Sequence, residues 1–295
     1  MPEHFASFDF HLHTYWSYDA DAAPAEYARR AAELHLKAFA VTDHHNFDAY
    51  QELREAAAAE CPGALLIPGA EMSARTPFGV QDIVCIGFTP KPGGAWKRIL
   101  DRSRELQREW GEAISQECLR RGIPFDHAAR EQLLRSYRPA HVIAVQGVTH
   151  VKSTQIKPAL LARGMKDLDE FYDIIRHAMG DDAFLDSRDV VSAVHDAGGL
   201  AFWAHPYDYR KEPDETWLDQ LCEYAPVDGL ECAHTDIPPE MTRFYRDYCV
   251  RHRLLSTAGS DCHAFPAGSP ATREKMAGHI GEDAWLDEIL ERLRR

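Results

Sequence analysis

Short apolar runs alternate with helical patterns along much of this chain, and that alternation limits the folds it can adopt. An opening run begins at Phe8, and six further runs are predicted to be buried strands: 37–45, 64–74, 81–88, 200–206, 229–234 and 254–263. Between the first two runs, Pro24 is placed to begin a helix whose apolar residues share one face. Strands that alternate with helices favour a parallel sheet, so we predict an α/β fold whose seven strands close into a TIM-like barrel.

The segment from 91 to 187 breaks this alternation. Most of it has helical patterns, as at Leu106, Trp110 and Ile114, and it contains no clear strand. We predict that residues 8–90 and 188–295 form the barrel, and that residues 91–187 form a helical insertion over the barrel mouth that contributes to substrate selection. Within 97–138 ten Lys or Arg outnumber seven Asp or Glu, and most of these charges are expected to pair on a solvated helix face.

The composition narrows the class of protein. A net charge of −14 argues against a nucleic-acid polymer as a partner, because a protein that binds the phosphate backbone needs a basic surface. Seven scattered cysteines without a CxxC pair are typical of reduced thiols in a cytoplasmic protein. The first residues do not resemble a signal peptide, and no apolar run approaches the ~20 residues that span a bilayer. We therefore expect a soluble, cytoplasmic protein with no membrane partner, whose oligomeric state the sequence leaves open.

Residues of the kinds that bind metal ions stand at the ends of five predicted strands. The two histidines of "FDFHLH" are two positions apart, so in a strand both imidazoles point to the same face. The carboxyl ends of the strands in a β/α barrel form one face, so side chains far apart in the sequence are expected to converge there. Imidazoles and carboxylates together suit Mn²⁺, Zn²⁺ or Fe²⁺. The residues are His11, His13, Asp43, His44, Glu71, His205, Asp261 and His263.

The segments that carry these residues resemble the successive motifs of the PHP (polymerase and histidinol phosphatase) family. The matching segments are "DFHLHTYWSYDAD", "VTDHH", "GAEMS", "AHP" and "GSDCH", in that order. The resemblance implies a distorted seven-stranded β/α barrel that holds two or three divalent metal ions and hydrolyses phosphate esters. The long helical segment before "AHP" is similar to that of the family's small-molecule phosphoesterases.

The resemblance also implies how the ligands are divided between two divalent metal ions. One ion would be held by His11, His13, Glu71 and Asp261, and the other by Asp19, His44 and His263. His205 would lie beside them, as a further ligand or as a contact to phosphate.

The sequence departs from the family pattern at the third metal site that some members possess. Val84 and Gln155 stand where two further histidine ligands are expected. Whether Asp82, His150 or Gln155 rebuilds a third site is left open. We therefore expect two metal ions, with Glu71 bound to one of them rather than bridging a pair.

Two neighbouring metal ions lower the pKa of a bridging water to near 7 and neutralise charge on the phosphoryl oxygens, so a metal-bridging hydroxide is the expected nucleophile. His45, His205 and His234 are the candidate catalytic residues for protonating the leaving group. Arg210, Lys152 and Lys157 are candidate contacts to substrate phosphate, and Tyr15 is a candidate for stacking on a substrate ring.

These features predict a metal-dependent phosphoesterase acting on a small phosphorylated metabolite: a phosphomonoester, a cyclic phosphate or a nucleotide bisphosphate. One alternative is an amide or lactone hydrolase on the same barrel. The lysine that an amidohydrolase needs at the end of a middle strand is not found, which counts against this alternative. Another alternative is a non-catalytic, metal-binding PHP module.

Overall fold

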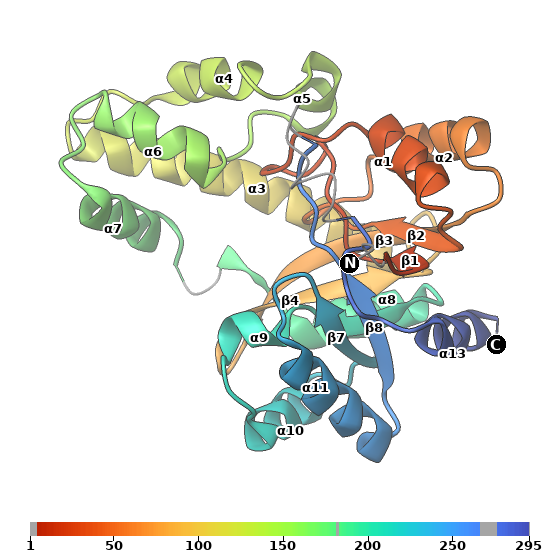
Figure 1. Ribbon diagram of the computed structural model, residues 1–295. Coiled ribbons are helices and arrows are strands. Elements are labelled where there is room, and N and C mark those ends of the chain that lie inside the picture. Colours follow the sequence, from red (N-terminus) through yellow and green to blue (C-terminus); the bar gives the residue numbers. More distant parts are fainter. Residues whose placement is uncertain (1–4, 181–182, 266–275, 295) are drawn as a thin grey trace.

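The computed structural model describes residues 5–180, 183–265 and 276–294. Within these residues one eight-stranded sheet forms the centre of the molecule (Figure 1). The strands are β1 (Phe8–Asp9), β2 (Ala38–Val41), β3 (Leu65–Thr76), β4 (Gly79–Ile86), β5 (Leu185–Asp186), β6 (Leu200–Trp203), β7 (Gly229–His234) and β8 (Leu255–Gly259). Their order across the sheet is β1-β2-β3-β4-β6-β7-β8, and the short β5 pairs with β3.

The two ends of this sheet approach each other and nearly close a barrel. Backbone hydrogen bonds join the segments at the ends of β1 and β8: the Phe10 amide donates to Ala258, and the Asp261 amide donates to His11. A parallel bridge between Leu12 and Cys262 continues the contact. The predicted TIM-like barrel is therefore confirmed.

One strand departs from the predicted all-parallel arrangement. β4 runs antiparallel to both of its neighbours, β3 and β6. The cause is local, because only residues 77–78 connect β3 to β4, and a parallel pair needs a crossover of a dozen or more residues. Gly79 adopts the φ of +104° that this tight reversal requires. β5 is a second difference, since no strand is predicted within residues 91–187.

Helices cover the outside of the barrel (Figure 1). In α1, Tyr27, Ala28 and Ala31 are buried, as the helical spacing predicts. The helices are α1 (Pro24–Glu33), α2 (Tyr50–Glu60), α8 (Ser187–Asp196), α9 (Pro206–Tyr209), α10 (Glu215–Tyr224), α11 (Pro239–His252) and α13 (Asp283–Leu293). None of the helices in the described residues is both long and apolar enough to cross a membrane.

Five helices form a separate layer away from α10, α11 and α13 (Figure 1). They are α3 (Ala95–Arg120), α4 (His127–Arg135), α5 (Ala140–Gln146), α6 (Ser153–Leu161) and α7 (Leu168–Ala178). This layer has its own apolar core, which includes Phe125 and Ile174, whereas Trp96 near the start of α3 belongs to the barrel core. Surface charges in the layer pair with each other at helical spacing, as Lys97 does with Asp101.

The helical layer contacts the loops that follow β1 and β2. Arg138 donates to the carbonyl of Trp16, and Gln107 donates to that of His44. The aromatic ring of Tyr18 lies 4.2 Å from the ring of His150. The insertion is therefore in contact with the ends of the strands that carry the predicted ligands.

Candidate metal centre

Loops at the carboxyl ends of the strands bring the predicted ligands together. His11 and His13 follow β1 within four residues, and their ring centroids are 5.1 Å apart, as expected for side chains that share one face. The other residues are Asp19 before α1, His44 after β2, Glu71 within β3, His205 after β6, and Asp261 and His263 after β8. They form overlapping groups in which the potential donor atoms lie within 4.8 Å of one another.

The first group consists of His11, His13, Glu71 and Asp261. His13 Nε2 lies 2.9 Å from Asp261 Oδ1, and His11 Nε2 lies 3.1 Å from Glu71 Oε2. The side chains of both histidines and of Glu71 have no exposed surface. The group that the family resemblance implies for one metal ion is therefore assembled in the structure.

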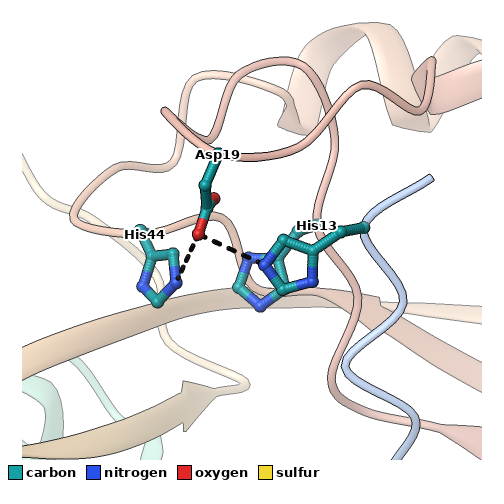
Figure 2. Close-up of side chains that lie close together, drawn as sticks. His13, Asp19 and His44 are labelled. Carbon is teal, nitrogen blue, oxygen red and sulfur yellow. Dashed lines mark hydrogen bonds and ion pairs between the residues drawn. The ribbon is translucent and has the colours of Figure 1, made fainter. Parts of the chain in front are cut away.

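The second group consists of His13, Asp19, His44 and His263. Figure 2 shows the carboxylate of Asp19 facing the imidazole of His44, with the ring of His13 beside them. Asp19 Oδ2 is 3.4 Å from His44 Nε2 and 3.3 Å from His263 Nε2. His13 belongs to both groups, so the two candidate positions for metal ions are adjacent.

A third group consists of Glu71, Asp82 and His205. Glu71 turns Oε2 toward His44, at 3.2 Å, and Oε1 toward His205, also at 3.2 Å. This geometry places Glu71 between two groups, which differs from the expected contact with one metal ion only. Of the three residues considered for a third site, Asp82 lies in this group. His150 instead lies against Tyr18 and Trp110, and Gln155 is on α6.

Unsatisfied polar atoms test whether these residues suit metal ions. His11 Nε2, His13 Nε2, His44 Nδ1 and Glu71 Oε2 are buried and make no hydrogen bond of acceptable geometry, although the three nitrogens lie 3.1 to 3.2 Å from Glu71 Oε2. A buried polar atom without a partner costs about 1–3 kcal/mol, so a set of such atoms aimed at one place is expected only where something satisfies them. Imidazole nitrogen and carboxylate oxygen are the donors that Mn²⁺, Zn²⁺ and Fe²⁺ accept, so the residues fit divalent metal ions.

The charges of the group perturb its pKa values strongly. Burial would lower the pKa of His44, but the carboxylates of Glu71 and Asp19 raise it to about 10. The pKa values of His205 and His263 rise to about 9 despite their burial, chiefly through hydrogen bonds to Glu71 and Asp19. Without metal ions these imidazoles are therefore protonated, and a metal ion has to displace the protons in order to bind.

Glu231 holds two of the histidines in place and was missed in the sequence. Its carboxylate lies in β7 with 1% exposure, 3.0 Å from His11 Nδ1, and accepts a 2.7 Å hydrogen bond from the backbone amide of His205. Such a partner fixes the orientation of a ligand histidine. A glutamate in the middle of the apolar strand "GLECAH" was the signal that could have identified it.

Asp43 has an anchoring role and lies in none of the three groups. It accepts hydrogen bonds from the amide and the hydroxyl of Thr14, at 2.6 and 2.8 Å. These bonds tie the loop after β1 to the end of β2.

Three non-glycine residues near the groups have left-handed backbones. The φ values of His45, His205 and Asp261 are 59°, 27° and 51°. Such conformations are costly for residues with a Cβ and tend to be retained where a side chain must be aimed. The surrounding hydrogen bonds hold them, including the bond from the His45 amide to the Glu71 carbonyl.

The other candidate catalytic histidines lie close to the groups. The ring of His234 is 6.5 Å from that of His11 and 6.2 Å from that of His205. His234 Nδ1 accepts a hydrogen bond from the amide of Asp236, so the neutral ring carries its proton on Nε2, which has no partner. His45 is buried, and burial lowers its pKa to about 3.

The candidate substrate contacts are dispersed. The Lys152 ammonium is 2.6 Å from Asp21, and that of Lys157 lies over two aromatic rings of α7. The Arg210 guanidinium lies over the ring of Trp217. Tyr15 donates a 2.6 Å hydrogen bond to Glu52 on α2, so its hydroxyl is engaged outside the three groups.

Comparisons with known proteins agree with the family resemblance. The family model of the PHP domain matches residues 9–237. A 5′-3′ exoribonuclease from Haemophilus influenzae is 24% identical over 88% of this chain and 91% of its own length. A 5′-3′ exoribonuclease from Salmonella typhimurium is 26% identical over 87% of this chain and 85% of its own. A 48-residue stretch is 52% identical to an uncharacterized protein from Methanocaldococcus jannaschii, but it spans only 16% of this chain and 22% of that protein.

Solved structures agree on the fold. A protein from Bifidobacterium adolescentis assigned as a metal-dependent phosphoesterase superimposes with a TM-score of 0.71 at 24% identity, over 97% of this chain and 96% of that one. An amidohydrolase from Chromobacterium violaceum gives a TM-score of 0.73 at 22% identity, over 97% of both chains.

The relatives correct one prediction. The net charge argued against a nucleic-acid polymer as a partner, and that inference is wrong, because two relatives that match over most of their length are named as exoribonucleases. Net charge is a poor guide here because bound metal ions supply positive charge of their own. The chain belongs to the PHP domain family and is a metal-dependent phosphoesterase, as its motifs predict.

Proposed function

We propose that this enzyme hydrolyses phosphodiester bonds at the 5′ end of short RNA chains. The observation that carries the proposal is the trio of overlapping groups joined through His13 and Glu71, which can place several divalent ions beside one phosphate. The exoribonuclease relatives support the choice of substrate. A short RNA is favoured because the candidate phosphate contacts Lys152, Lys157 and Arg210 are dispersed, whereas a long RNA is held by many basic contacts to its phosphates.

The proposed ligands are the residues of the three groups. His11, His13, Glu71 and Asp261 would hold one ion, Asp19, His44 and His263 a second, and Asp82, His205 and Glu71 a third. Mn²⁺, Zn²⁺ and Fe²⁺ all suit these donors. When bound, the ions supply an activated water and neutralise charge on the phosphoryl group.

His234 is proposed to hydrogen-bond the leaving oxygen. Its Nδ1 is occupied by the Asp236 amide, so the Nε2–H is available as a donor at all pH values where the ring is neutral. Burial lowers the pKa of His234, which keeps the ring neutral at physiological pH. A hydrogen-bond donor near the leaving group stabilises the charge that develops there.

Basic residues of the insertion are proposed to contact phosphate next to the scissile bond. Lys152 is 95% buried by its surroundings and paired with Asp21, whose amide donates to the carbonyl of the ligand His263. Lys157 lies farther along α6, over the rings of Phe171 and Tyr172. In this proposal residues 91–187 select the substrate. The cytoplasmic location suggested by the cysteines stays a prediction.

A free nucleotide bisphosphate is the second candidate substrate. The dispersal of Lys152, Lys157 and Arg210 favours it, because a small substrate needs no phosphate contacts beyond the centre itself. The two candidates share the bond that is broken and differ in the number of linked nucleotides.

The test is hydrolysis of a 3′-labelled, 5′-phosphorylated RNA pentamer by protein loaded with Mn²⁺. Stepwise shortening from the 5′ end with release of mononucleotides is expected, and Asp261→Asn should abolish it. Asp173→Asn, which replaces an exposed aspartate on α7 paired with Arg176, is the control and should leave the rate unchanged. Cleavage of a nucleotide bisphosphate but not of the pentamer would support the second candidate. Stoichiometric metal binding without hydrolysis of either would refute both proposals and favour the non-catalytic alternative.

A further inference from the structure

A cavity of about 420 Å³ lies between the barrel and the insertion. The barrel side contributes Tyr18, Asp82 and Tyr209, and the insertion contributes Trp110 on α3 and Tyr172 on α7. Its volume is that of a site for a small ligand. The proposed chemistry takes place beside this cavity and leaves its interior unused.

The cavity adjoins the candidate metal centre. Asp82 belongs both to its wall and to the third group of potential ligands. Tyr209 donates a 2.6 Å hydrogen bond to Asp82, and the ring of Tyr18 lies 5.3 Å from that of His44. When a phosphate is held at the metal centre, the group esterified to it can therefore reach into the cavity.

Aromatic rings form several parts of the walls. Trp110 lies 4.9 Å from Phe184 and 5.3 Å from His150, and His150 lies 4.2 Å from Tyr18. Phe171 and Tyr172 form the wall on α7. Flat rings favour a flat, unsaturated ligand, because aromatic rings stack on one another. Every nucleobase has a π face, so this stacking does not depend on which base is bound.

The polar atoms in the cavity indicate a heterocycle rather than a plain hydrocarbon. His150 is 9% exposed, and its Nδ1 has no hydrogen-bond partner. The hydroxyls of Ser73 and Ser153 also line the cavity. Of the described residues in its wall, none is Lys or Arg, and the Lys157 ammonium lies over the rings of Phe171 and Tyr172. A ring with polar edges and no charge matches this lining.

We infer that the cavity binds the nucleobase of the nucleotide whose phosphate lies at the metal centre. The inference rests on the proposed function and adds to it the part of the substrate that the enzyme recognises. The base inserts between the rings of the insertion and the barrel, and the unpartnered Nδ1 of His150 meets its polar edge. Recognition by stacking makes the site tolerant of base identity and intolerant of a missing base.

The test compares two ligands that share a 5′-phosphate and a ribose and differ only in the base: adenosine 5′-monophosphate and ribose 5-phosphate. Their binding to the Mn²⁺-loaded protein is measured by titration calorimetry. We expect adenosine 5′-monophosphate to bind roughly 5- to 150-fold more tightly, the range expected for stacking of one base. Tyr172→Ala and Phe184→Ala should each reduce this difference and leave the affinity for ribose 5-phosphate unchanged.

Leu168→Ala is the matched control for Tyr172→Ala. Both residues are on α7 and are similarly exposed, at 49% and 52%, but Leu168 does not line the cavity. Equal affinity of the wild-type protein for both ligands would refute the base site and leave the proposed function intact. Failure of both ligands to bind would overturn the proposed function and the base site together. An equal loss of nucleotide affinity in Tyr172→Ala and Leu168→Ala would show that α7 as a whole, rather than the stacking surface, is responsible, and would also refute the inference.

Discussion

Replacing Glu231 by glutamine tests how the candidate metal centre is held together. The carboxylate of Glu231 accepts from two donors, the imidazole of His11 at 3.0 Å and the backbone amide of His205 at 2.7 Å. Glutamine has one oxygen and one NH₂ group, so it can accept from only one of them. Its NH₂ group would then face a donor in a site with 1% exposure.

The size of the effect follows from these two bonds. Loss of one bond to a buried donor costs about 1–3 kcal/mol, and replacing partners of ligand histidines lowers metal affinity about 10- to 100-fold. A tenfold change corresponds to about 1.4 kcal/mol, so the two ranges agree. We expect Glu231→Gln to bind Mn²⁺ about 10- to 100-fold more weakly and to lose phosphoesterase activity at limiting metal.

The assay is equilibrium dialysis against Mn²⁺ with metal analysis, together with thermal unfolding of the metal-free proteins. Asp228→Asn is the matched control, because Asp228 also accepts from an imidazole, that of His195 at 2.8 Å, and from a backbone amide, that of Ala201 at 2.9 Å. Asp228 precedes β7 and belongs to none of the three ligand groups. Metal affinity that falls equally in both variants, or in neither, would refute a positioning role for Glu231.

Three further outcomes are expected. First, metal binding should release protons near pH 7, because the pKa of His44 is raised to about 10 in the metal-free site; calorimetry in buffers of different ionisation enthalpy measures this, and zero release would contradict it. Second, burial lowers the pKa of His279 to about 4, below its unfolded value of about 6.5, so its contribution to stability is complete above pH 6.5 and declines as the pH falls to 4. The total is about 3 kcal/mol from this shift, and denaturant unfolding of His279→Gln between pH 4 and 7 should show a shallower pH dependence than the wild type. Third, Gly259→Ala should disrupt the centre, because a Cβ there would lie 2.1 Å from Cβ of His11; circular dichroism and metal analysis test this, and wild-type metal content would refute it.

The sequence predicted the positions of most strands because their apolar runs have to be buried in any compact fold. It also indicated that strand ends carry ligands, since five of them follow β1, β2 or β8 within four residues: His11, His13, His44, Asp261 and His263. It did not indicate the direction of β4, which depends on the two-residue connection between two predicted runs. It also predicted that Glu71 contacts one metal ion only, whereas the two oxygens of Glu71 face different histidines.

What the sequence by itself determined is the kind of chemistry, because the ligand types and their spacing around short strands are local properties of the chain. Only the tertiary structure decided how these residues are shared. Asp82 joins His205 and Glu71 because β4 runs antiparallel between β3 and β6, which no local pattern specifies. Glu231 reaches His11 across 220 positions because strands far apart in the chain become neighbours only when the barrel closes. The aromatic cavity likewise exists only where the insertion meets the barrel, at a contact between residues that the sequence keeps far apart.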